Sequence, residues 1–174
     1  ADVWGEAIDS VLASPPTPDA QATLVLPTPA GYPFNHAAAE SLAASPWLVF
    51  LPARYEGMDG RVIEHYRTRP EVAQVCEYSI GDYVLSGGEL PAAIVLDAVA
   101  RLQEGVLGHP DSAVNESFSQ PTLLDCPQYT RPEEFRGWRA PEVLLGGNHA
   151  HIRQWREQAA HEKTARLRPD LLDS

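Results

Sequence analysis

The alternation of short apolar runs with segments of helical spacing is the feature that most constrains the fold. Apolar and β-branched residues gather at 22–26, 47–51 and 74–79, and each run has the length of a buried strand. Residues 36–44 and 60–66, which lie between these runs, are expected to be helices. Strands that alternate with helices are typical of βαβ units and a parallel sheet. The sequence therefore predicts an α/β fold with a mainly parallel sheet.

Further elements are expected outside this alternating region and at its edges. Pro27 is expected to end the first strand, because proline carries no amide donor for a sheet. A fourth short strand is expected at residues 83–85. Apolar spacing also predicts helices at residues 3–13, 90–102 and 150–163.

Charge divides the chain into two parts. The 174 residues include 13 Lys and Arg against 24 Asp and Glu, a net charge of −11, which argues against a non-specific coat on nucleic acid. Residues 131–168 hold 8 basic and 5 acidic side chains, whereas residues 1–130 hold 5 and 17. Residues 105–123 lack periodicity and are interpreted as a linker. We expect an acidic body that carries a basic C-terminal arm.

Several classes of protein are excluded by missing signals. The longest apolar run, residues 91–96, is far shorter than the roughly 20 residues that cross a membrane, and no signal peptide is recognisable. Neither a GxGxxG string nor a P-loop is present. Cys76 and Cys126 lack zinc spacing, and His149 and His151 lack the spacing of one helical face, so no metal site is expected. Two reduced cysteines favour a cytoplasmic location.

Three loops follow the predicted strands, where open α/β sheets bind ligands. They are residues 28–31, 53–57 and 80–88. Gly87 and Gly88 allow a close backbone approach and open a helix whose first amides can donate to a ligand. We expect Gly88 to adopt a positive φ and to leave room for that ligand. The alternative is a tight turn with no ligand.

Candidate catalytic and binding residues lie outside these loops. Arg101, near the end of an apolar helix, can hold an oxygen in a cleft or extend to solvent. Glu116 lies in the predicted linker, where an isolated carboxylate is normally solvated. The basic arm contains a set suited to phosphates, or else forms a solvated helix face. That set is His149, Arg153, Arg156, Lys163 and Arg166.

Six strings, in order along nearly the whole chain, resemble the bacterial tRNA (guanine-N1)-methyltransferases, a SPOUT-class family. They are RYEGMDGRVI at 54–63, YSIGDYVLSGGEL at 78–90, GVLG at 105–108, PQYTRP at 127–132, PEVLLGGNHA at 141–150 and RPDLL at 168–172. The resemblance implies a deep trefoil knot in the α/β sheet and a small helical C-terminal domain. It implies an S-adenosylmethionine-binding domain over 1–107, a linker over 108–123 and a tRNA-binding domain over 124–174.

The resemblance also implies methyl transfer from S-adenosylmethionine to N1 of the guanosine just 3′ of the tRNA anticodon. It implies a homodimer whose active sites lie at the subunit interface. The family's cofactor residues fall here on Pro27, Thr28, Pro29, Ala53, Arg54, Tyr55, Glu56, Gly57, Ile80, Gly81, Asp82, Tyr83, Val84, Leu85, Gly87, Gly88 and Pro91.

The catalytic pair that the resemblance implies is Arg101 and Glu116. Removal of the guanine N1 proton needs a base, and the charge that develops on O6 needs a cation. Glu116 stands where the family has aspartate, and Ala53 where it has glycine. The family also has a glycine-rich segment that would precede Ala1, so this chain is expected to be a piece of a longer product. Two alternatives remain: a knotted methyltransferase of another RNA, or a catalytically silent RNA-binding module.

Overall fold

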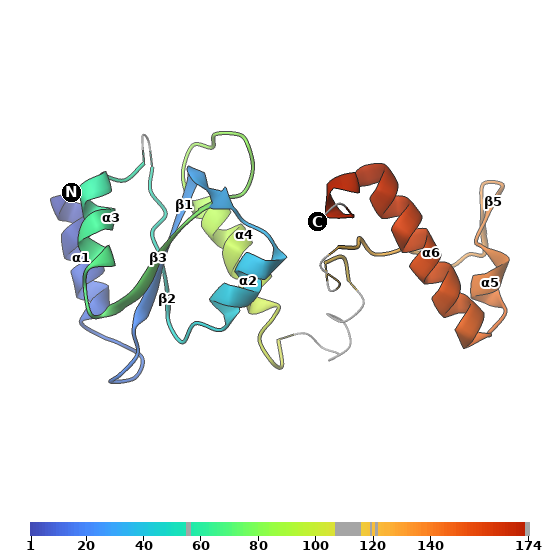
Figure 1. Cartoon of the computed structure of the whole chain (residues 1–174), viewed down its shortest axis with the longest axis horizontal. Coiled ribbons are helices and arrows are strands. Elements are labelled where there is room, and N and C mark those ends of the chain that lie inside the picture. Colours follow the sequence, from blue (N-terminus) through green and yellow to red (C-terminus); the bar gives the residue numbers. More distant parts are fainter. Residues whose placement is uncertain (55–56, 107–115, 119, 121, 173–174) are drawn as a thin grey trace. The chain divides into compact units, whose positions relative to one another are not determined.

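A computed structural model describes residues 1–54, 57–106, 116–118, 120 and 122–172 of the chain. The chain divides into two compact units, Ala1–Leu107 and Gly108–Ser174, and each is described by itself. Figure 1 labels most of their helices and strands. No helix among the described residues is both long and apolar enough to span a membrane.

Unit 1, Ala1–Leu107, is built on a sheet of three parallel strands. Strand β1 (Ala22–Pro33) lies between β2 (Leu48–Phe50) and β3 (Val72–Ser79). Helix α2 (His36–Ala43) connects β1 to β2, and α3 (Gly60–Arg67) connects β2 to β3. The predicted α/β class and its parallel sheet are confirmed.

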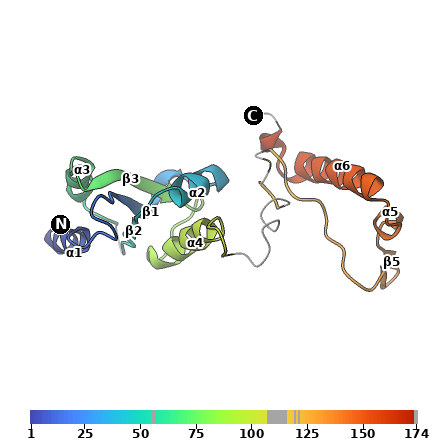
Figure 2. The same cartoon turned by 90° about the horizontal axis from the view of Figure 1, so that it is seen from below.

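Helices cover both faces of this sheet (Figures 1 and 2). Helices α1 (Asp2–Leu12) and α3 pack on one face, and α2 and α4 (Glu89–Ala100) pack on the other. Successive side chains of a strand point to opposite faces. Leu24 and Leu26 therefore join the core beneath α1 and α3, whereas Val25 joins the core beneath α2 and α4.

Side-chain caps start two of the helices where the sequence predicts them. The Asn35 side chain accepts a hydrogen bond from the Ala38 amide at 3.0 Å. The Asp59 carboxylate accepts one from the Arg61 amide at 2.9 Å. The Arg61 guanidinium and then this amide hold the pKa of Asp59 well below its usual range. Each cap satisfies an amide that has no partner within its helix.

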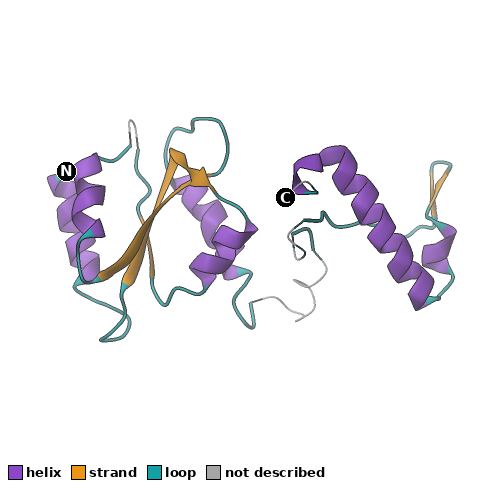
Figure 3. Ribbon diagram, viewed as in Figure 1, coloured by secondary structure: helices purple, strands orange, loops and turns teal. Residues whose placement is uncertain are grey.

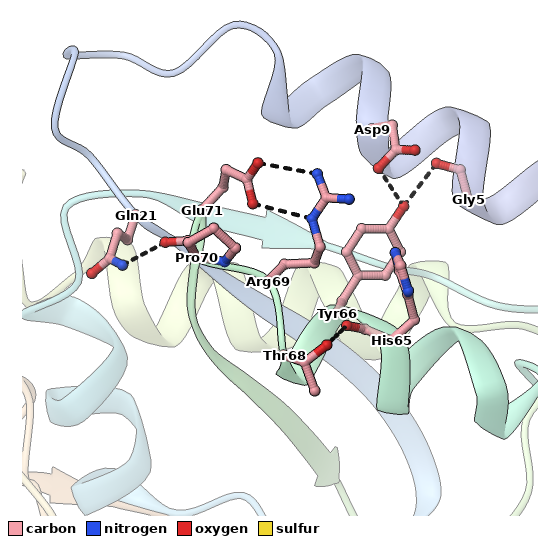
Figure 4. A network of polar contacts seen from close by, with 9 residues as sticks. All are labelled: Gly5, Asp9, Gln21, His65, Tyr66, Thr68, Arg69, Pro70 and Glu71. Atoms are coloured by element: carbon pink, nitrogen blue, oxygen red, sulfur yellow. Dashed lines mark hydrogen bonds and ion pairs between the residues drawn. The ribbon is translucent and has the colours of Figure 1, made fainter.

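A buried tyrosine ties α3 to α1 (Figure 4). Tyr66 is 2% exposed, and its hydroxyl lies 2.7 Å from Asp9 Oδ1 and 2.9 Å from the Gly5 carbonyl oxygen. Because a phenol has one hydrogen, it donates to one of these acceptors at a time. Burial, and then the Asp9 carboxylate, raise the pKa of Tyr66 to about 12.

Two predictions about strands are wrong. β1 continues past Pro27, because the φ of proline suits an extended chain and only a donor is lost, although pairing with β3 is irregular between Pro27 and Tyr32. Residues 83–85 form no strand. After Gly81, whose φ is 153°, the chain turns, and the Tyr83 amide donates to the Gly81 carbonyl at 2.9 Å.

Unit 2, Gly108–Ser174, contains one long helix, α6 (His149–Leu167), longer than the predicted 150–163. The helix α5 (Glu142–Leu145) precedes it, and a 3-10 turn, η2 (Pro169–Leu171), follows it (Figure 3). A short antiparallel hairpin of β4 (Glu134–Phe135) and β5 (Trp138–Arg139) lies before α5. No strand is predicted from the sequence at these residues.

Candidate functional site

A cavity of about 480 Å³ opens in unit 1 at the carboxyl ends of the strands. It is lined by residues 26–30 at the bulged part of β1, by residues 77–81 at the end of β3, and by the loops that follow β2 and precede α4. Its volume is within the range of about 300–1,000 Å³ typical of small-molecule sites. The parallel topology therefore brings three segments that are distant in sequence to one pocket.

Most of the predicted cofactor residues line this cavity. They are Pro27, Thr28, Pro29, Ala53, Gly57, Ile80, Gly81, Tyr83, Val84, Leu85, Gly87, Gly88 and Pro91. Arg54 and Asp82 are not among its lining residues, and Tyr55 and Glu56 lie outside the described residues. Ligand binding by this set stays a prediction.

Several lining residues are not predicted from the sequence, including Leu26, Met58, Ile63, Glu64 and Glu77. Met58 and Ile63 belong to the string at 54–63, so their signal was present. Nothing in the local sequence pattern around Glu64 or Glu77 separates these residues from solvated carboxylates. The pairing of β3 with β1, which joins distant segments, places Glu77 at the cavity.

The backbone of Gly88 has a different conformation from the one expected. Its φ is −80°, so the predicted positive φ is wrong. A Cβ at this position would lie 2.9 Å from Pro52 Cα and 3.0 Å from the Ala53 nitrogen. The Gly88 amide donates to the Ala53 carbonyl at 2.8 Å. The missing side chain lets the loop before α4 pack on the backbone that follows β2.

Arg54 also connects the loop that follows β2 to the residues at the start of α4. Its Nε donates to Glu89 Oε1 at 2.5 Å, and Arg54 bridges Gly87 in an antiparallel pair. The pKa of Glu89 is lowered by a hydrogen bond from its own amide and then by Arg54. A carboxylate in the first turn of a helix is also favoured by the helix dipole. Arg54 therefore holds the wall of the cavity rather than facing its interior.

Two carboxylates give the cavity an acidic side. Glu64 and Glu77 both line it, and Arg67 binds both, at 2.9 Å to Glu64 and 2.6 Å to Glu77. Two negative charges against one positive charge leave a net negative charge here. This charge favours a ligand that carries positive charge.

A second cavity, of about 620 Å³, lies within unit 2. The half-buried Glu116 lines it together with His149, Arg153 and Arg156. The structure thus brings the predicted catalytic carboxylate and three predicted RNA-binding side chains to one cavity. Burial raises the pKa of the Cys126 thiol, which also lines this cavity.

The other predicted residues lie elsewhere. Lys163 and Arg166 line a neighbouring hollow of unit 2 with Tyr129 and Trp155, whose rings meet edge-on at 6.0 Å. Arg101 is half-buried at the end of α4, in unit 1. In the part of the chain that the structure describes, no group of three metal-ligating side chains occurs.

The fold and the cavity of unit 1 define an α/β protein with a cavity of ligand size at the carboxyl edge of a parallel sheet. Residues 1–174 match the family described as tRNA (guanine-1)-methyltransferase TrmD. The chain therefore belongs to this family.

Curated relatives agree with this family. A tRNA (guanine-N(1)-)-methyltransferase of Kineococcus radiotolerans is 51% identical over 174 residues, covering 97% of this chain and 61% of that protein. Proteins of the same name from Streptomyces avermitilis and Streptomyces coelicolor are 48% and 47% identical, each over 98% of this chain and 61% and 62% of their own length. The chain thus spans about three fifths of the length of these relatives.

Proposed function

We propose that the protein methylates N1 of the guanosine directly 3′ of the anticodon in tRNA, with S-adenosylmethionine as the methyl donor. One observation carries the proposal. The strings that resemble the family lie far apart in the sequence, and two of them, at 54–63 and 78–90, contribute residues to a single cavity of ligand size.

The residues of the unit 1 cavity fit this donor. Its volume suits a nucleoside-sized molecule, and the excess carboxylate of Glu64 and Glu77 complements a cationic sulfonium and ammonium. Residues 27–29 and 80–88 would hold the molecule, largely by backbone contact. When bound, S-adenosylmethionine supplies an electrophilic methyl group.

In this proposal, Glu116 acts on the proton of guanine N1, and Arg101 acts on the charge that develops on O6. Guanine N1 is a poor nucleophile until its proton leaves, and Glu116 accepts that proton as general base. Arg101 stabilises the negative charge that develops on O6. Glutamate is longer than aspartate by one methylene, and the carboxylate chemistry is the same.

The basic helix α6 binds the tRNA backbone in this proposal. Arg153, Arg156 and Arg166 are exposed along it, and His149 lies at its start. Exposed guanidinium groups contact phosphates and release counterions, which makes binding depend on salt. The acidic remainder of the chain need not touch the tRNA.

An exposed apolar face supports the homodimer. Val84, Leu90 and Ile94 are 81%, 68% and 50% exposed, and Leu90 and Ile94 share one side of α4. Apolar exposure of this kind marks an interaction surface, and a second copy of the chain is the occupant that we propose.

The proposal includes the trefoil knot in unit 1 and, because tRNA is the substrate, a cytoplasmic location.

A radiolabelled transfer assay tests the function. The protein is incubated with methyl-labelled S-adenosylmethionine and bulk tRNA, and the tRNA is digested to nucleosides. Label in 1-methylguanosine is expected. Label in a different nucleoside supports a methyltransferase of another RNA. Absence of label, together with no calorimetric heat on adding S-adenosylmethionine, supports a silent RNA-binding module.

A further inference from the structure

Ser117 and Phe118, which directly follow Glu116, hydrogen-bond to Asp125 and Leu123, and these two pairs close a turn in unit 2. The Asp125 amide donates to Ser117 Oγ at 2.9 Å, and the Phe118 amide donates to the Leu123 carbonyl at 3.0 Å. The φ of Phe118 is 71°, a left-handed conformation that a phenylalanine adopts only when its surroundings hold it there. Glu116 directly precedes this turn, so the course of its backbone depends on what holds the turn.

Two adjacent side chains of α6 form hydrogen bonds to residues 124 and 125, which are the second side of this turn. Lys163 Nζ donates to the Asp125 carbonyl at 2.9 Å, and the Leu124 amide donates to Thr164 Oγ1 at 3.0 Å. The Thr164 hydroxyl itself donates to the Ala160 carbonyl at 2.7 Å. Thr164 is 0% exposed, and its hydroxyl both donates and accepts, so its orientation is fixed.

Lys163 differs from the other cations of α6. It is half-buried with its ammonium on a backbone carbonyl, whereas Arg153, Arg156 and Arg166 are exposed. One of its three donors is therefore directed at the turn. Glu116 lines one cavity with Arg153 and Arg156.

We propose that Lys163, assisted by Thr164, is a positioning residue that acts through Asp125 and the turn to set Glu116 in its cavity. The inference rests on the proposed function, because it assigns Lys163 a part in the same methyl transfer. It replaces the prediction that Lys163 contacts phosphate.

The first test separates rate from binding. Lys163→Met keeps the aliphatic stem and removes the ammonium. We expect the single-turnover rate at saturating tRNA and S-adenosylmethionine to fall about 10- to 100-fold, as small displacements of catalytic groups do. The Kd for tRNA stays within about threefold, since no phosphate contact is lost. Lys163→Arg retains a donor and restores most of the rate.

The salt dependence of tRNA binding distinguishes a cation of α6 that contacts phosphate from one that positions the turn. Arg166→Met is the matched variant, and we expect it to lower the log–log salt slope of tRNA binding by about one. Lys163→Met leaves the slope unchanged. A slope lowered by about one in Lys163→Met overturns the proposal and restores Lys163 as a phosphate contact.

A double-mutant cycle tests whether Lys163 acts through Glu116. In a Glu116→Gln background, Lys163→Met should cost less than about threefold in rate, because the group that it positions is already inactive. An equal loss in both backgrounds overturns the proposal.

Amide hydrogen exchange tests the turn without any activity. We expect exchange at Leu124 and Asp125 to rise about tenfold in Lys163→Met, while far-ultraviolet circular dichroism stays that of the wild type. Unchanged exchange overturns the proposal. If the wild-type protein transfers no methyl group, the proposed function fails, and the exchange result still decides whether Lys163 holds the turn.

Discussion

Replacing Tyr66 by phenylalanine removes one hydroxyl from the contact between α1 and α3. The hydroxyl lies 2.7 Å from the Asp9 carboxylate, and hydrogen bonds to charged acceptors contribute about 1.5–3 kcal/mol. Asp9 is exposed, so water replaces the lost donor and reduces the cost. The ring remains and leaves no cavity. We therefore expect Tyr66→Phe to lower the free energy of unfolding by about 1–2 kcal/mol at pH 7.

The same substitution has a pH signature. The pKa of Tyr66 is raised from 10.0 in the unfolded chain to about 12 in the folded protein, by burial first and by Asp9 second. The neutral hydroxyl thus stabilises the fold fully below pH 10, and this contribution is lost as the pH rises through the folded pKa. Two pKa units correspond to at most about 3 kcal/mol. The stability advantage of the wild type over Tyr66→Phe should narrow between pH 10 and pH 12.

Urea unfolding followed by circular dichroism at pH 7 and pH 11 measures both effects. Tyr83→Phe is the matched control, because Tyr83 is 54% exposed and its hydroxyl lies 3.3 Å from the Ile80 carbonyl. We expect this control to change the free energy of unfolding by less than about 0.5 kcal/mol. The reasoning is refuted if Tyr66→Phe behaves like the control, or if its deficit is the same at both pH values.

Three further predictions concern the cavity and α6. Gly88→Ala should lower the free energy of unfolding by about 1–3 kcal/mol and weaken S-adenosylmethionine binding in calorimetry, because its Cβ meets backbone, whereas Gly60→Ala, with open space around its Cβ, should not destabilise unit 1. Arg153→Ala with Arg156→Ala should lower the salt slope of tRNA binding by about one for each lost contact, and an unchanged slope would make α6 a solvated face. Asn148→Ala removes the cap on two amides of α6 and should cost about 1 kcal/mol in thermal unfolding; no change would show that the cap is dispensable.

The parallel core of unit 1 could be predicted because its signals are local. Leu24 and Val25 face opposite sides of β1, so a strand covered on both faces has a continuous apolar run. Asn35 and Asp59 begin their helices through side chains within three residues. These elements do not depend on distant parts of the chain.

The errors and omissions arise where distant segments meet. The error at Pro27 is of this kind, because the continuation of β1 pairs with Tyr78 and Ser79 of β3, far away in the sequence. The place of Lys163 depends on the turn at Asp125. Local patterns of apolarity and charge carry no information on such pairings. The roles of Glu116 and Arg101 came only from the family resemblance.

Two tRNA transcripts that differ only in the nucleotide 3′ of the anticodon, guanosine or adenosine, test the central claim most directly. Single-turnover methyl transfer is measured with the protein and with Glu116→Gln, at saturating S-adenosylmethionine and tRNA. We expect methylation of the guanosine transcript alone, and a rate about 10²- to 10⁴-fold lower in Glu116→Gln, the range of a lost general base. Equal methylation of the two transcripts, or a Gln variant within about threefold of the wild type, far outside that range, would contradict the account.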